Sequence, residues 1–302
     1  MSIAIPSAAW TTWHPDPVGL ASIALAVVYL ASARRSRFAV PGARRIACTT
    51  GCAMLAILAC GPIHAYAPHL FWARALEITV LLYCVPLLLA SGMPVTVIGG
   101  NLPTHLRRRG ERFLRSAPAK AVTHPAVASG LLLVTPWVLL FTSWNTTALA
   151  HPALDVLTRG WLLAVGVGYY YSRTQADPVP RRYPQSLSLL ITLVESLADG
   201  VLGIVVWLGP TMDTIYYAGL GLTDTAQLRL SQTVGAGMLW LLADVFGLPF
   251  LMLLMTALRR EDSRRQARAD AAIDAASEER PGDEPTTGLW WETDPRMTDR
   301  YR

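Results

Sequence analysis

Long apolar segments constrain this chain more than any other feature of its sequence. A helix needs about 20 mostly apolar residues to cross the hydrocarbon layer of a bilayer. Seven segments approach or exceed that length, near residues 17–33, 45–65, 70–99, 125–145, 156–172, 185–209 and 231–257. Only 16% of the residues are charged, whereas soluble domains carry about 25%. The pattern predicts an all-α, polytopic membrane protein with seven transmembrane helices.

The connections between these segments alternate in charge. Three of them, and the chain after residue 258, are rich in Arg, whereas the alternate connections 66–69, 146–155 and 210–230 contain only Arg229. Because cytoplasmic loops carry the excess of Lys and Arg, the N-terminus is predicted outside and the C-terminus inside the plasma membrane.

This orientation divides the chain into three parts. We expect residues 1–16 to be an extracytoplasmic segment and residues 17–258 to form the transmembrane domain. Residues 259–302 are predicted to be a cytoplasmic tail, first helical and then disordered, because Pro, Gly and mixed charges give it little to bury.

Missing motifs exclude several functions. There is no Walker sequence and no His-Glu-x-x-His, which argues against an ATP-driven pump and a zinc protease. The only lysine is Lys120, so the seventh segment has no lysine to carry retinal, and the Arg-rich composition suggests a GC-rich, actinobacterial genome. The basic residues fall in short clusters between apolar segments, which favours a lipid bilayer over nucleic acid as a partner.

Ionisable residues inside a membrane are costly and raise a functional question. Glu195 and Asp199 lie four residues apart in the sixth segment, and Asp244 lies at a similar depth in the seventh. Carboxylates so placed repel unless a proton, a cation or an arginine intervenes. They suit a cation or proton pathway; alternatively, protonated acids hydrogen-bond across the bundle.

Metal-binding candidates lie on the predicted outer face. His64, His69 and His151, with Asp155, Met212 and Asp213 nearby in the topology, are residue types that bind copper, although histidine is also ordinary in interfacial loops. Cys48 and Cys52 share a helix face, where thiolates select Cu(I) and small side chains allow close helix packing.

A series of short motifs then follows the order of a known family. They are Trp13-His14-Pro15-Asp16-Pro17, the stretch Leu70–Ile78, Pro86–Pro94, His124-Pro125, Leu149–Pro152, and Ser231-Gln232 with Gly235 and Met238-Leu239-Trp240. Over residues 10–258 the chain resembles the CtaG family of membrane proteins, which assist cytochrome c oxidase assembly. The resemblance implies seven spans, haem–copper oxidase subunits of the respiratory chain as partners, and no enzymatic activity.

The chain departs from this family at the residues that matter most. The family has a His-Met-x-Gln-His signature where this chain has Arg74, Ala75, Glu77 and Ile78, and a second histidine pair where it has Asp155 and Arg159. Ser231 stands for the aspartate of the family's Asp-Gln pair, whereas Gln232 is retained.

The resemblance therefore implies an assembly or support protein without the family's histidine copper site. No cofactor is expected, and copper bound by the outer-face histidines is the alternative. The replacements are complementary in charge. Arg74 lies one helical turn from Glu77, and Asp155 one turn from Arg159, so each pair is predicted to form an ion pair in the space of a former metal centre. We expect the second pair to be the wetter one.

Overall fold

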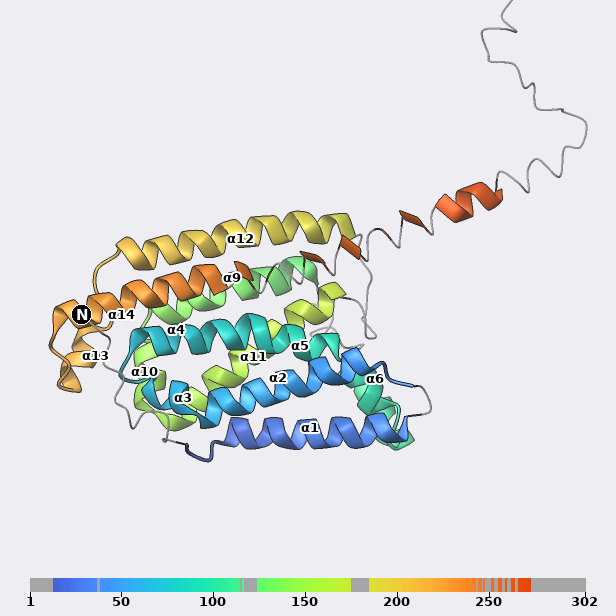
Figure 1. Cartoon of the computed structure of the whole chain (residues 1–302), viewed down its shortest axis with the longest axis horizontal. Helices are drawn as coiled ribbons and strands as arrows, with labels where there is room; N and C mark the ends of the chain where they lie inside the picture. The colour runs from blue at the N-terminus through green and yellow to red at the C-terminus, as the bar shows by residue number, and fades with distance from the viewer. Residues whose placement is uncertain are drawn as a thin grey trace, which may run out of the picture. The chain divides into compact units, whose positions relative to one another are not determined.

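The computed structural model describes residues 13–36, 39–114, 116, 124–174, 185–242 and short stretches between 244 and 272. The elements in this part of the chain are helices, without strands, which confirms the all-α prediction (Figure 1). The chain divides into two units, Met1–Leu254 and Met255–Arg302. In the second, residues 266–272 are helical, as predicted for the start of the tail. The predicted disorder lies outside the described residues.

The first helices form an antiparallel pair. Helix α1 (Pro17–Arg35) begins at Asp16, whose carboxylate accepts hydrogen bonds from the backbone N–H groups of Val18 and Gly19. It packs on α2 (Gly42–Cys60), which continues after a break into the short α3 (Pro62–Tyr66). The packing is close at Gly19, where a Cβ atom would lie 2.3 Å from the Cys60 sulfur.

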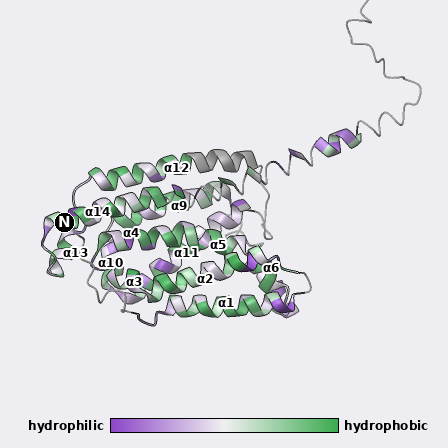
Figure 2. Cartoon of the chain, in the orientation of Figure 1, coloured by the Kyte–Doolittle hydropathy of each residue, from purple (hydrophilic) through white to green (hydrophobic). Residues whose placement is uncertain are grey.

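The exposed side of α1 is apolar. The helix buries the small residues Gly19, Ser22 and Ser32 together with Tyr29, whereas Leu20 and Val27 are more than half exposed. Figure 2 shows the same apolar colouring along its length. Small residues inside and large apolar residues outside are typical of a helix packed in lipid.

The most buried helical segment contains α4 (Phe71–Thr79), the π-helical turn η2 (Val80–Cys84) and α5 (Val85–Ser91). The π turn accommodates Pro86, which lacks a backbone N–H for a regular helical bond. The predicted interruption at Pro94 is a complete break. Met93 adopts a left-handed conformation with φ 53°, and α6 (Pro94–Gly99) and then α7 (Thr104–Leu114) follow.

The next helices surround this segment. Helix α9 (Pro125–Phe141) is followed by α10 (Trp144–Ala150), with a bend of 71° between them. Helix α11 (Pro152–Thr174) packs against η2 and α5. The approach is closest at Gly166, where a Cβ atom would clash with the Leu82 carbonyl oxygen. Helix α12 (Gln185–Leu208) matches the predicted sixth segment.

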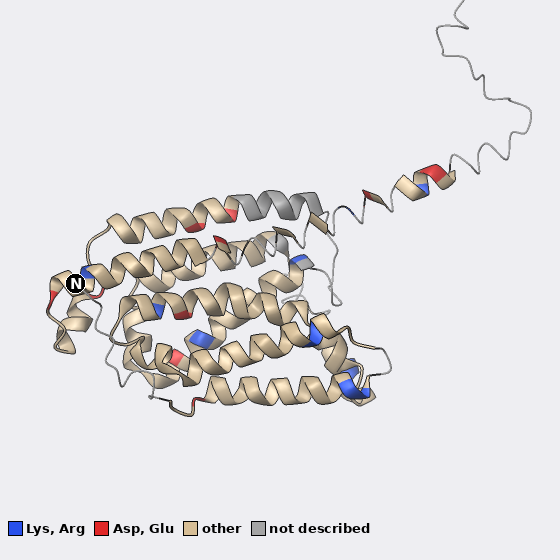
Figure 3. Ribbon diagram, in the orientation of Figure 1, with Lys and Arg blue, Asp and Glu red and all other residues tan. Residues whose placement is uncertain are grey.

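The last elements of the first unit are α13 (Thr214–Gly219), α14 (Thr225–Gly237) and the π-helical turn η3 (Met238–Leu242). Helix α14 packs on α4 at Gly235, where a Cβ would meet the Phe71 ring at 2.6 Å. Charged residues are sparse in the helical bodies and include some on α4 and α12 (Figure 3).

Three helical segments of the described chain are long and apolar enough to cross a membrane, namely Pro17–Arg35, Gly42–Tyr66 and Phe71–Ser91. A fourth results if the bent pair α9–α10 forms one span. Membrane-spanning character is therefore present, whereas the count of seven and the orientation stay predictions.

Candidate functional site

The predicted ion pair of α4 is present and buried. The Arg74 Nη1 and Glu77 Oε2 atoms are 2.8 Å apart, and the two side chains are 1% and 0% exposed. One helical turn separates them, as the sequence spacing requires. A charge pair at this depth is stable only if both charges are compensated.

The second predicted pair is joined to the first. Arg159 Nε lies 2.8 Å from Asp155 Oδ2 on α11, and Asp155 Oδ1 accepts a 2.9 Å hydrogen bond from Arg74 Nη1 on α4. Asp155 is 6% exposed and Arg159 2%. This pair is slightly more exposed than Arg74 and Glu77, in the direction expected. Both pairs are buried because α11 packs directly against the segment that contains α4.

Asp16 extends the cluster to α1. Its two carboxylate oxygens accept hydrogen bonds of 3.1 and 2.8 Å from Nη1 and Nη2 of Arg159, a bidentate geometry. Burial raises the pKa of Asp16. The hydrogen bond and charge of Arg159, together with two backbone N–H groups, lower this pKa by more, so the net shift is downward. Asp16 thus caps α1 and pairs with α11 as a carboxylate.

His64 and Asn145 complete the surroundings. His64 Nδ1 lies 3.0 Å from Glu77 Oε1, and Arg74 Nε donates a 3.1 Å hydrogen bond to Asn145 Oδ1. Asn145 in turn donates a 3.0 Å bond to Asp213. We call Asp16, His64, Arg74, Glu77, Asp155 and Arg159 the charge network. Nothing in the sequence pointed to Asn145, which lies in an ordinary polar stretch. Asp16 belongs to the motif Trp13-His14-Pro15-Asp16-Pro17, but the motif alone indicated no function for it.

These residues do not fit a histidine copper site. The two guanidinium groups of the charge network would repel a further cation. His69 and His151 are exposed, and the His64 nitrogen nearest the network faces Glu77. Within the described residues, no group of three or more His, Cys, Asp or Glu side chains is arranged to hold a metal ion.

The other family-signature positions serve packing. Ala75 and Ile78 are buried, and Ala75 faces Gly235 of α14. The Ser231 hydroxyl accepts a 3.3 Å bond from the Trp72 backbone, which ties α14 to α4.

Gln232 organises the turn that follows α12. Its Nε2 donates to the carbonyl oxygens of Val206 and Pro210, at 2.7 and 3.0 Å. Its Oε1 accepts a 2.7 Å bond from the Met212 backbone. This one buried amide therefore fixes the path of residues 206–212.

The carboxylates of α12 have separate partners. Glu195 accepts hydrogen bonds from Tyr169 at 2.5 Å and from Arg173 at 2.8 Å. The predicted fifth segment ends near residue 172, which leaves Arg173 in the connection that follows, and this boundary is too early. α11 continues to Thr174, so Arg173 is fully buried in its last turn and neutralises Glu195.

Asp199 has a different environment. It accepts a 2.8 Å hydrogen bond from Tyr83 of the π turn η2, and Asp244 accepts a 2.5 Å bond from Ser196. Glu195 is thus neutralised by an arginine, which is one of the conditions predicted from the sequence for these carboxylates. Asp199 is instead stabilised by a hydroxyl donor.

Cys48 and Cys52 lie in tightly packed surroundings. Both are buried, and at Gly92 a Cβ would approach the Cys48 Cβ to 2.5 Å. The small side chains permit this approach, as the packing alternative requires.

Comparison with known proteins matches this architecture to one family. The model of the cytochrome c oxidase caa3 assembly factor family matches residues 27–261, a range that contains most of the charge network and all of α12 and α14. The chain belongs to this family. The family is described as one of assembly factors, a description that names no enzymatic reaction.

Three relatives that the chain matches are mycobacterial. Uncharacterised proteins of Mycobacterium bovis and Mycobacterium tuberculosis are each 27% identical over 278 residues, and one of Mycobacterium leprae is 24% identical over 279. Each alignment covers 88% of this chain but 42% of the relative, so the chain spans less than half their length. No solved structure matches the chain significantly.

Removing one member of the network tests its energetics. Arg74→Ala leaves Glu77 and Asp155 without their shared cation, a change that costs about 3–5 kcal/mol at a buried site. We expect a marked loss of folded protein, measured as thermal stability and monodisperse yield in detergent. The double variant Arg74→Ala/Glu77→Ala should recover part of the loss.

The exposed Arg44 provides the control, because Arg44→Ala removes the same charge from the surface. Asp155→Ala should be destabilising to a similar degree as Glu77→Ala, since both carboxylates are buried. Wild-type melting in all the network variants would contradict the account.

Proposed function

We propose that this protein assists or supports the assembly of a haem–copper oxidase in the plasma membrane, by helix contacts and without a copper ion of its own. The family gives the assembly role. The observation that carries the finer proposal is the charge network, since Arg74, Asp155 and Arg159 stand where the family resemblance has histidines. A guanidinium group cannot ligate copper, but it can hold helices together.

The network gives the protein a rigid frame for such contacts. It joins α1, α4 and α11, and Asn145 adds α10. Around this frame, large apolar side chains such as Val134 and Trp161 remain exposed. In a bilayer these surfaces are available to lipid and to the helices of oxidase subunits.

The proposal includes seven spans with the N-terminus outside. Three or four spans meet the length and hydropathy criteria, and α11, α12 and the α14–η3 segment supply helices for the others. An actinobacterial plasma membrane is the proposed location, supported by the mycobacterial relatives.

Two alternatives remain distinct from this proposal. Copper handling would use His64, His69 and His151, but the exposure of the last two and the Glu77 contact of the first weigh against it. A cation or proton pathway would use Glu195, Asp199 and Asp244. The neutralisation of Glu195 by Arg173 leaves Asp199 as its best test.

The orientation is tested by labelling with a membrane-impermeant thiol reagent. In a background without Cys48, Cys52, Cys60 and Cys84, single cysteines at the exposed positions 69 and 151 should react from outside the cell, because the loop charges place them there. Cysteines at the exposed positions 42 and 110 should react only after the membrane is opened. The reverse pattern, or external labelling of all four, would overturn the seven-span arrangement.

The assembly role is tested in the host. Deletion of the gene should lower the level of spectroscopically detectable haem–copper oxidase, and affinity purification from native membranes should enrich oxidase subunits over an equally tagged polytopic protein. Asp199→Asn preserves a hydrogen-bond acceptor for Tyr83, so it should restore the oxidase level as the wild type does.

Unchanged oxidase in the deletion strain would contradict the assembly proposal. Failure of Asp199→Asn to restore the oxidase, with normal amounts of the variant in the membrane, would favour the cation or proton pathway.

A further inference from the structure

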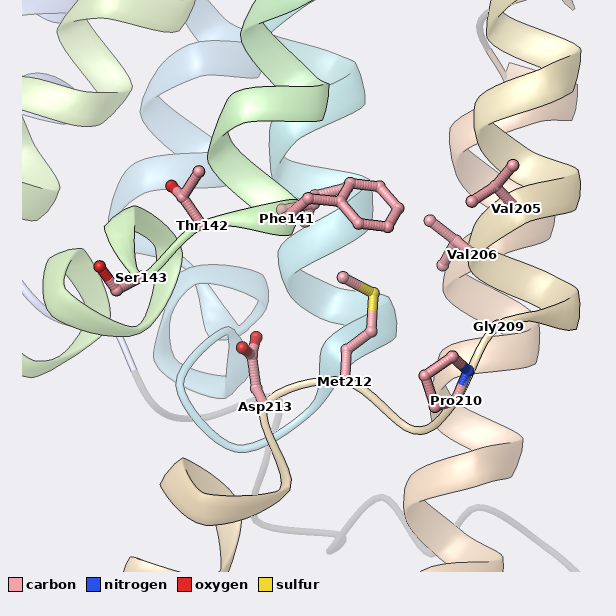
Figure 4. A pocket seen from close by; sticks show the side chains of 10 residues that line it. Phe141, Thr142, Ser143, Val205, Val206, Gly209, Pro210, Met212 and Asp213 are labelled. Atoms are coloured by element: carbon pink, nitrogen blue, oxygen red, sulfur yellow. The ribbon is translucent and has the colours of Figure 1, made fainter.

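A cavity of about 320 Å³ lies between the ends of α9 and α12. Its walls are largely apolar, with Phe141 from one helix, Val205 and Val206 from the other, and Met212 from the turn (Figure 4). Asp213 supplies a carboxylate at one side. An apolar cavity with a single charged group is typical of a binding site for an amphiphilic molecule.

Asp213 is held in a costly state. Its φ of 55° lies in the left-handed region, which is uncommon for residues other than glycine. Burial raises the pKa of Asp213, and the hydrogen bond from Asn145 to its Oδ2 lowers it by less. In the described structure no cation pairs with this carboxylate. A partly buried carboxylate without a cation beside it in the described structure is a candidate position for binding a positively charged group.

The surroundings favour a positively charged group at Asp213. The C-terminus of the 17-residue helix α9 reaches the cavity at Phe141, and its last carbonyl groups carry the negative end of the helix dipole. A carboxylate and a helix C-terminus together attract an ammonium ion and repel a phosphate.

A positive group lies on the other side of the turn. Arg229 of α14 donates hydrogen bonds to the carbonyl oxygens of Trp207 and Gly209, and Gly209 lines the cavity. Arg229 is also the only basic residue of the predicted outer connections. Arg229 is not among the residues that line the cavity; it holds the turn in place through these two carbonyl groups.

The cavity borders an exposed apolar surface. Phe141 is 48% exposed, Val205 37% and the neighbouring Leu208 69%. In the seven-span arrangement proposed above, these side chains face the acyl chains of the bilayer near the outer interface. The molecule with direct access to the cavity is a membrane lipid.

We propose that this cavity binds a phospholipid with an ethanolamine headgroup, its ammonium at Asp213 and its acyl chains along α9 and α12. A primary ammonium donates N–H bonds to a carboxylate, whereas a choline group has none to donate. The proposal rests on the membrane arrangement above but not on the oxidase role. Through Asn145, the bound headgroup is linked to Arg74 of the charge network.

The test uses the purified protein in detergent, titrated with phosphatidylethanolamine, phosphatidylcholine or phosphatidylglycerol of equal chain length. Phosphatidylethanolamine should raise the melting temperature saturably, with an apparent affinity about tenfold above that for either other lipid, because a ligand that binds only the folded state stabilises it. Asp213→Asn should lose this preference. Asparagine tolerates the left-handed conformation and can still accept the Asn145 bond, so this variant should fold.

The matched control is Asp224→Asn. Asp224 is exposed and caps α14, and asparagine caps a helix about equally well. This variant should keep the preference. Val205→Phe, which fills the cavity without changing charge, should lose it.

Equal responses to the three lipids, or a preference that survives in Asp213→Asn, would overturn the proposal. The measurement needs no oxidase, so its outcome is separate from that of the assembly experiment, and the cysteine labelling reports independently on the membrane arrangement.

Discussion

The buried guanidinium of Arg74 is the group on which the arrangement of these helices depends. Its side chain is 1% exposed among packed, mostly apolar helices, and it contacts Glu77 at 2.8 Å and Asp155 at 2.9 Å. A charge in such surroundings is tolerated only with full compensation. The two carboxylates come from α4 and α11, so the requirement for compensation fixes how these helices meet. Arg159 and Asp16 then bring α1 to the same point.

On the proposal above, the network also accounts for the departures from the family's histidine signature. A metal centre holds helices by coordination bonds from neutral imidazole groups, whereas these residues hold them by paired charges. A single histidine replaced by arginine would leave an isolated buried cation. An arginine at position 74 needs the carboxylates of Glu77 and Asp155 to compensate its charge. Arg159 in the same way needs Asp155 and Asp16.

Much of the helical arrangement was predictable, because apolar length and proline positions determine where membrane helices begin and break. The pair Arg74–Glu77 followed from helical spacing, whereas Asp155–Arg159 was found through the family resemblance together with helical spacing. The Arg74–Asp155 contact followed from neither, because it depends on how α11 packs on the segment containing α4, which close approach at Gly166 permits. Arg173 was misplaced for a related reason. An arginine at the end of an apolar segment is normally assigned to the following loop. Arg173 is helical and buried because Glu195 on another helix neutralises it, and the sequence does not show this pairing.

The central claim is that the charge network occupies the place of a copper centre. It is tested most directly by copper analysis of the purified wild type beside a variant carrying Arg74→His, Ile78→His, Asp155→His and Arg159→His. The account predicts no stoichiometric copper in the wild type and about one copper per chain in the folded variant, because imidazole groups would then replace guanidinium and carboxylate groups on adjacent helices. Copper bound to the wild type, or a folded variant that binds none, would contradict it.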